Sequence, residues 1–173
     1  RSQIYVIIVP DVSYYSSVVD YAAWKETTLG DSVWVISADT IVAYFPAVNR
    51  VESIRNFLDY AYTNNSTEYA LLIGETYDIP MLECWPDPNN HTPNPDENPV
   101  PTDYYYADLT GNWDSDGDGY YGEFGQDSVD FAAELFVGRI PWSEQNTILQ
   151  ICNKLKNCKN IFISLKKWAL MLG

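Results

Sequence analysis

Short hydrophobic runs alternate with amphipathic stretches in the first part of the chain. Three short apolar runs read as strands: Ile4–Pro10, which is rich in β-branched residues and reads as buried on both faces, Ser32–Ser37, and Tyr69–Gly74, which also reads as a buried strand. Between them, Val18–Leu29 and Asn49–Asn64 carry apolar residues at helical spacing, with Gly30 expected to end the first helix and Asn49 as the candidate N-cap of the second. The pattern predicts the order β-α-β-α-β.

This order predicts an α/β fold with three layers, α/β/α, around a mainly parallel sheet, a flavodoxin-like arrangement. Ligands of such sheets gather beyond the carboxyl ends of the strands. Those ends are expected at Pro10–Asp11, Ser37–Asp39 and Gly74–Glu75.

The periodicity stops after the third run. Residues 80–102 contain six prolines beyond Pro80 and predict a proline-rich surface loop. Tyr104–Leu109 then reads as a short strand, and Phe131–Ile140 as a strand with a turn.

The last part of the chain is predicted to hold one helix and the start of a strand. Pro141 and Ser143 precede a helical pattern over Glu144–Cys158, with Ser143 as its cap. The apolar run Trp168–Leu172 reads as the start of a strand. The whole chain, 1–173, is therefore predicted to be a single α/β domain.

The acidic segment 112–123 predicts a calcium loop. Calcium prefers six to eight oxygen ligands on a tightly curled backbone. Counting from Asn112, oxygen-bearing residues fall at positions 1, 3, 5 and 12 of the EF-hand spacing, with glycine at position 6. The candidate ligands are Asn112, Asp114, Asp116, Asp118 and Glu123.

A second register of the same loop starts at Asp114, but it places Gly125 at position 12, so we prefer the register that supplies Glu123. The segments on either side of the loop do not read as helices, which favours a structural calcium site over a sensor. The alternative is a solvated acidic turn, in which four carboxylates would repel one another without a cation.

Composition narrows the function classes. The net charge is −14, with 24 acidic against 10 basic residues, which argues against a nucleic-acid partner. The same charge fits a secreted protein, a halophilic source or a calcium binder. No apolar run approaches the ~18 residues of a membrane-spanning helix, so no membrane span is expected. Arg1 shows neither an initiator methionine nor a signal-peptide pattern, which indicates a processed chain or an excised segment.

The chain has three cysteines, Cys84, Cys152 and Cys158, which cannot all pair with one another and are expected to be buried or free thiols. Cys84 and His91, the only histidine, could form a nucleophilic pair. Both lie in the proline-rich segment, which offers no strand end or helix end to hold such a geometry, so we favour an ordinary exposed histidine.

Four segments, in this order, resemble the gingipain-like family of cysteine peptidases: Tyr69–Pro80, Pro101–Leu109, Asn112–Glu123 and Glu134–Pro141. The resemblance is clear over about residues 65 to 155. It implies a caspase-like α/β fold, a catalytic Cys–His dyad, bound calcium and a protein or peptide substrate.

The resemblance also implies where the catalytic residues lie. In the family the histidine and the cysteine follow the strand that would begin at Trp168–Leu172, so no nucleophile or base is assigned in this chain. Glu134 fits the family position of an acid that orients the histidine; alternatively it binds Arg139 or a backbone amide. The sequence therefore suggests the amino-terminal part of a secreted or cell-surface cysteine endopeptidase, inactive alone, or else a non-catalytic calcium-stabilised module.

Overall fold

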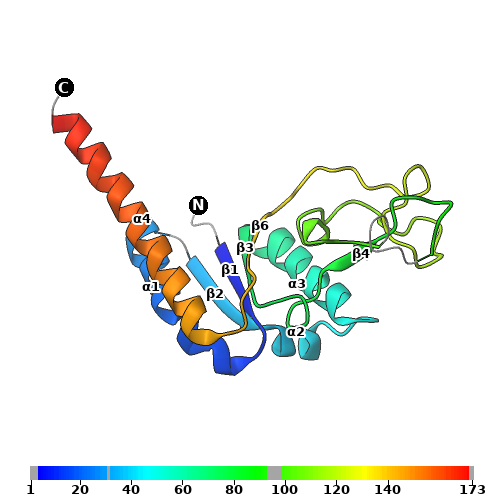
Figure 1. Cartoon of the computed structure of the whole chain (residues 1–173), viewed down its shortest axis with the longest axis horizontal. Coiled ribbons are helices and arrows are strands. Elements are labelled where there is room, and N and C mark those ends of the chain that lie inside the picture. Colours follow the sequence, from blue (N-terminus) through cyan, green and yellow to red (C-terminus); the bar gives the residue numbers. More distant parts are fainter. Residues whose placement is uncertain (1–3, 31, 93–98, 172–173) are drawn as a thin grey trace.

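A parallel sheet of four strands lies at the centre of the molecule, with helices on both faces (Figure 1). The computed structural model describes residues 4–30, 32–92 and 99–171. The strand order is β2-β1-β3-β6, and every neighbouring pair is parallel. The strands are Ile4–Val9 (β1), Ser32–Ser37 (β2), Thr67–Ile73 (β3) and Phe136–Ile140 (β6). The predicted α/β/α architecture is confirmed.

Among the described residues, four α-helices flank the sheet: Tyr15–Leu29 (α1), Ala38–Tyr44 (α2), Arg50–Asn65 (α3) and Gln145–Met171 (α4). In Figure 1, α1 and α4 lie together on one side of the sheet and α2 and α3 on the other. A one-turn 3₁₀ helix, Val12–Tyr14, connects β1 to α1.

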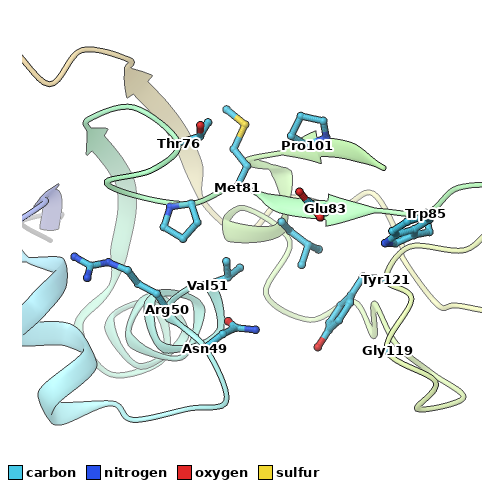
Figure 2. A pocket seen from close by; sticks show the side chains of 12 residues that line it. Asn49, Arg50, Val51, Thr76, Met81, Glu83, Trp85, Pro101, Gly119 and Tyr121 are labelled. Carbon is cyan, nitrogen blue, oxygen red and sulfur yellow. The ribbon is translucent and has the colours of Figure 1, made fainter. Parts of the chain in front are cut away.

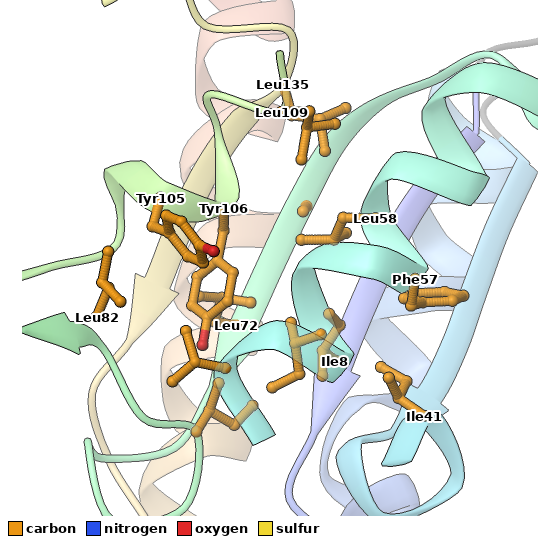
Figure 3. Packing of buried hydrophobic residues seen from close by; sticks show 14 of the residues in the cluster. Ile8, Ile41, Phe57, Leu58, Leu72, Leu82, Tyr105, Tyr106, Leu109 and Leu135 are labelled. Atoms are coloured by element: carbon orange, nitrogen blue, oxygen red, sulfur yellow. The ribbon is translucent and has the colours of Figure 1, made fainter. Parts of the chain in front are cut away.

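The central strand β1 is buried on both faces because its side chains alternate between two hydrophobic clusters. Ile8 points to the cluster under α2 and α3, together with Ile41, Leu58 and Leu72 (Figure 3). Ile7 points to the opposite cluster, which includes residues of α1 and α4. Full burial of one such side chain stabilises the fold by about 1.5–3 kcal/mol.

Two helix ends follow the sequence signals. The residue after α1 is Gly30, whose φ of 77° is the left-handed conformation that ends a helix without steric cost to glycine. Asn49 caps α3, since its side-chain oxygen accepts the amide of Glu52 at 2.8 Å. Both predictions are confirmed.

Helix α2 was not predicted. It follows β2 without a loop, and Ser37 ends the strand and caps the helix by accepting the amide of Thr40 at 3.1 Å. Its seven residues are too few for an amphipathic period to stand out in the sequence.

The prediction of a strand at Tyr104–Leu109 is wrong, because Tyr104–Tyr106 forms a 3₁₀ turn. In this turn the hydroxyls of two neighbouring tyrosines bind different parts of the chain. The Tyr105 hydroxyl donates to Glu52 of α3, and the Tyr106 hydroxyl donates to the carbonyl of Pro80. Both rings are buried (Figure 3). A strand would place alternate rings on opposite faces and could not bury them side by side.

The prediction that residues 80–102 form only a surface loop is corrected at both ends of the segment. Leu82–Cys84 (β4) and Val100–Thr102 (β5) pair antiparallel in a separate two-stranded sheet. Leu82 and Cys84 are buried. Pro101 sits opposite Glu83 in this short sheet, a position at which the missing proline amide is tolerated. Residues 93–98 lie outside the described residues.

Helix α4 is longer than predicted and starts differently. The carboxylate of Glu144 accepts the amide of Thr147 at 2.8 Å, so Glu144 caps the first turn in place of Ser143. The helix continues to Met171, so the prediction of a strand at Trp168–Leu172 is wrong for residues 168–171, while Leu172 lies outside the described residues. No glycine or proline interrupts residues 145–171, and a short apolar run does not by itself separate helix from strand.

Across the described part of the chain, no helix combines the length and the hydropathy that crossing a membrane requires.

Candidate functional site

Two of the motif segments meet at the carboxyl edge of the sheet through a bidentate ion pair. Arg139 of β6 donates from Nη2 and Nε to the two carboxylate oxygens of Asp103, at 2.6 and 2.7 Å. Its Nη1 donates to the carbonyl of Gly74 at 2.9 Å. Arg139 thereby fixes the tyrosine turn and the end of β3 to the end of β6, and its side chain is only 7% exposed.

The loop after β3 is fixed to the segment before α4. The Ser143 hydroxyl donates to Asp78 at 2.5 Å and accepts from the Tyr77 hydroxyl at 2.7 Å. Gly74 has a φ of 122°, and a Cβ there would lie 2.9 Å from Asp78 Cβ, so this turn requires glycine.

An open pocket of about 780 Å³ lies beside this edge (Figure 2). Its walls come from four places: the start of α3, the loop after β3 with Thr76, the β4–β5 sheet with the residues beside it, and the second half of the acidic loop. Both apolar and charged side chains line it, among them Met81, Arg50 and Glu83 (Figure 2). The pocket lies beyond the carboxyl ends of the parallel strands, where the sheet topology predicts ligands to gather.

The acidic loop is tightly curled and brings three of its carboxylates together. One carboxylate oxygen from each of Asp114, Asp116 and Asp118 falls within a group whose atoms all lie within 4.8 Å of one another. Asp114 Oδ1 also accepts the amide of Gly119 at 3.3 Å. Gly117 and Gly119 hold left-handed φ values of 78° and 85°, which allow the tight curl.

The structure does not bring all five predicted ligands together. Glu123 lies outside the group of three aspartates and instead forms a second group with His91 and Asp118. The side-chain oxygen of Asn112 accepts the amide of Asp114 at 3.3 Å. The three grouped aspartates are positions 1, 3 and 5 of the register that starts at Asp114, with Gly119 at position 6.

Two further carboxylates hold the loop and were not singled out from the sequence. Asp127 accepts the amides of Ser115, Gly122 and Glu123 at 2.6, 2.8 and 2.9 Å, which ties the two ends of the loop together. Asp108, fully buried, accepts the amide of Gly111 at 2.7 Å and the Trp113 indole at 3.0 Å. The spacing of Asp108, Gly111 and Trp113 was the available signal, since a short acidic side chain three residues before a glycine commonly accepts its amide.

Glu134 lies just before β6. One carboxylate oxygen accepts the amides of Leu109 and Thr110 at 2.6 and 3.3 Å, and the other accepts the Thr110 hydroxyl at 2.9 Å. Of the alternatives raised from the sequence, Glu134 binds backbone amides, and Arg139 pairs with Asp103 instead.

The cysteines of this chain do not show the environment of an activated nucleophile. Burial raises the pKa of Cys84 from 9.0 to about 11, and burial raises the pKa of Cys152 likewise to about 11. A catalytic thiol requires the opposite shift. His91 pairs with Glu123 at 2.6 Å, and its ring stacks on Tyr120 with centroids 3.7 Å apart. Cys158 is exposed on α4.

Comparison with known protein families identifies the family of this chain. The family model of peptidase family C25 matches residues 1–172. The chain belongs to peptidase family C25. No curated protein matches the sequence.

Solved structures with the same fold include gingipains. The crystal structure of the Arg-specific cysteine proteinase gingipain R (RgpB) is 20% identical and superposes with a TM-score of 0.54, over 88% of this chain and 27% of its own. The complex of the RgpB pro- and mature domains from Porphyromonas gingivalis gives 20% identity and a TM-score of 0.54, over 86% and 27%. A structure described as a protease gives 16% and 0.58, over 88% and 27%. This C25 chain thus spans about a quarter of the length of these neighbours and shares their fold.

Proposed function

We propose that this chain forms the amino-terminal part of the catalytic domain of a secreted or cell-surface gingipain-like cysteine endopeptidase. The observation that carries the proposal is the C25 match over residues 1–172, supported by the ordered segments that meet through Asp103 and Arg139. The substrate class is protein or peptide. The Cys–His dyad is supplied from outside these residues, in keeping with the raised pKa of Cys84 and Cys152.

In this function, Glu134 is a positioning residue that orients the catalytic histidine. Its carboxylate is already fixed by the amides of Leu109 and Thr110, which leaves a preset acceptor at the start of β6. A carboxylate held in this way favours one tautomer and one orientation of an imidazole that approaches it.

Calcium stabilises the scaffold in this proposal. The donor set fits: three carboxylates lie together on a loop curled by left-handed glycines, and calcium prefers hard oxygen ligands. Asp114, Asp116 and Asp118 would hold the cation in the register that starts at Asp114. Calcium, when bound, would supply the positive charge that offsets their mutual repulsion.

A second candidate function is a calcium-stabilised binding module without catalysis. The buried Cys84 thiol, with its pKa raised to about 11, favours this alternative to a hydrolase that would use Cys84 and His91. The pocket beside Arg50 and Trp85 would then be the binding surface.

Peptide hydrolysis tests the proposal. The protein that carries this chain and the 173 residues alone are each incubated with a mixed peptide library, with and without a thiol-alkylating reagent. We expect hydrolysis by the longer protein that the reagent abolishes, and none by the 173 residues. Absence of thiol-dependent hydrolysis by the longer protein would favour the binding module. Hydrolysis by the short chain that disappears in Cys84→Ala would place the nucleophile in this chain and contradict our assignment.

A further inference from the structure

A histidine from the proline-rich segment meets two carboxylates of the acidic loop. One ligand atom from each of His91, Asp118 and Glu123 lies within 4.8 Å of the others. His91 comes from the proline-rich segment, whereas Asp118 and Glu123 belong to the acidic loop. The imidazole distinguishes this group from the oxygen-only group of Asp114, Asp116 and Asp118.

The carboxylate of Glu123 is buried and incompletely satisfied. Its side chain is 0% exposed, and Oε1 accepts from His91 at 2.6 Å and from the Gln126 amide at 3.1 Å. Oε2 has no hydrogen-bond partner in the described part of the chain. A buried carboxylate oxygen without a partner is costly, and a bound cation would satisfy it.

The backbone around the group is fixed in advance. The amide of Trp85 donates to the carbonyl of Tyr121 at 2.8 Å, and the amide of Phe124 donates to the carbonyl of Pro86 at 3.2 Å. These bonds align the segment that leads to His91 with the segment that carries Glu123. The imidazole ring stacks on Tyr120 at 3.7 Å and meets the edge of Trp85, which restricts its rotation. Ligands that are held before the metal arrives bind it more tightly.

We propose that His91, Asp118 and Glu123 form a second cation site, which shares Asp118 with the aspartate group and is specific for zinc or a similar first-row divalent metal. Imidazole with two carboxylates is a common zinc ligand set, whereas calcium takes oxygen ligands alone. Asp118 is exposed, so water can complete the coordination. The metal would join the proline-rich segment to the acidic loop at one wall of the pocket, where Trp85 and Tyr121 lie. This inference goes beyond the proposed function and does not depend on it.

Calorimetric titration with Zn²⁺ tests the site. The protein must carry no histidine tag, because His91 is the only histidine. Cys158→Ser serves as the parent, since the exposed thiol would bind zinc by itself. With calcium in excess, we expect one zinc per chain, with affinity lowered about tenfold or more in His91→Asn and in Glu123→Gln. Asp116→Asn, which removes a ligand of the aspartate group only, is the matched control and should bind zinc as the parent does.

Three results would overturn the proposal: no zinc binding by the parent, equal affinity in His91→Asn, or loss of zinc binding when calcium is in excess. The first would mean that His91 and Glu123 form only a hydrogen bond, and the last would mean that the two groups are one calcium site. A second measurement covers the case in which His91→Asn does not fold. Nuclear magnetic resonance of the parent reports one imidazole, whose ring nitrogens must shift on addition of zinc and stay unchanged on addition of calcium.

Discussion

Arg139 and Asp103, 36 residues apart in sequence, face each other in a bidentate pair at 2.6 and 2.7 Å. Each belongs to a short motif that looks unremarkable alone, and the pair joins the two motifs in space. A bidentate arginine–carboxylate pair fixes orientation as well as distance. Here it fixes the tyrosine turn on the edge strand of the sheet.

Replacing Arg139 should therefore destabilise the fold. In Arg139→Met, the carboxylate of Asp103 loses its partner, and we expect the free energy of unfolding to fall by about 3 kcal/mol. Arg139→Lys keeps the positive charge but loses the planar guanidinium that binds both carboxylate oxygens, so about half of that loss of stability is expected. Urea unfolding measures both. Lys154→Met, at an exposed position of α4, is the control. Equal stability of Arg139→Met and Lys154→Met would show that the pair does not stabilise the fold.

Glu134→Gln separates a catalytic contribution from a structural one. The amide still has an oxygen for the backbone amides of Leu109 and Thr110, so we expect only about 1 kcal/mol of lost stability. In the longer protein, kcat should fall by at least about tenfold with KM little changed, because an amide does not stabilise an imidazolium. Asp130→Asn, which lies in the exposed segment before β6, is the control for loss of charge. An unchanged kcat would exclude the positioning role.

The thiols should react in a defined order. At pH 8, a pKa of about 11 leaves roughly one Cys84 or Cys152 thiol in a thousand ionised, and both are buried. Cys158 is exposed and should be alkylated first. Mass spectrometry after short exposure to iodoacetamide identifies the modified residue, and all three should react in denaturant. Fast labelling of Cys84 in the folded chain would mean that its environment is not the apolar one described.

The same burial makes the fold sensitive to alkali. The pKa of Cys84 and Cys152 is raised from 9.0 to about 11 in the folded chain, so between pH 9 and 11 the unfolded chain releases these protons first. Fewer protons on the unfolded state mean that stability is full below pH 9 and declines as pH rises to about 11. Burial also raises the pKa of Tyr105 and Tyr106, which adds to the decline at higher pH. Urea unfolding across this range should show a shallower decline for Cys84→Ala/Cys152→Ala, and an unchanged slope would contradict the assignment.

The inner strands β1 and β3 were predicted well from the sequence because a strand buried on both faces is apolar along its length. Runs such as Ile4–Pro10 are apolar at every position, and no other short element of a small domain requires this. Gly30 and Asn49 marked helix ends for local reasons that hold in any context. The tyrosine turn and the far end of α4 could not be read in this way. Tyr105 and Tyr106 are held by Glu52 and Pro80, which lie far away along the chain.

The candidate site, too, could be predicted only in part from the sequence. The spacing of Asp114, Asp116 and Asp118 identified a cluster that the structure brings together. Glu123 was included because it falls at position 12 of a loop template, yet the backbone bonds between Trp85 and Tyr121 and between Pro86 and Phe124 direct it toward His91. A spacing rule for one loop contains no information on contacts that the loop makes with another segment, such as the contact between Glu123 and His91. His91 looked like an ordinary loop residue until that segment was placed beside the acidic loop.

Thermal unfolding with and without calcium tests the central claim, that this C25 domain is a scaffold stabilised by calcium at Asp114, Asp116 and Asp118. Calcium at about 100 times its Kd should add about 2.7 kcal/mol, which corresponds to a rise in Tm of roughly 5–10 °C. The rise should vanish in Asp116→Asn and persist in Asp59→Asn, which removes the same charge from an exposed position of α3. An equal rise in both variants, or none in the unmodified chain, would contradict the claim.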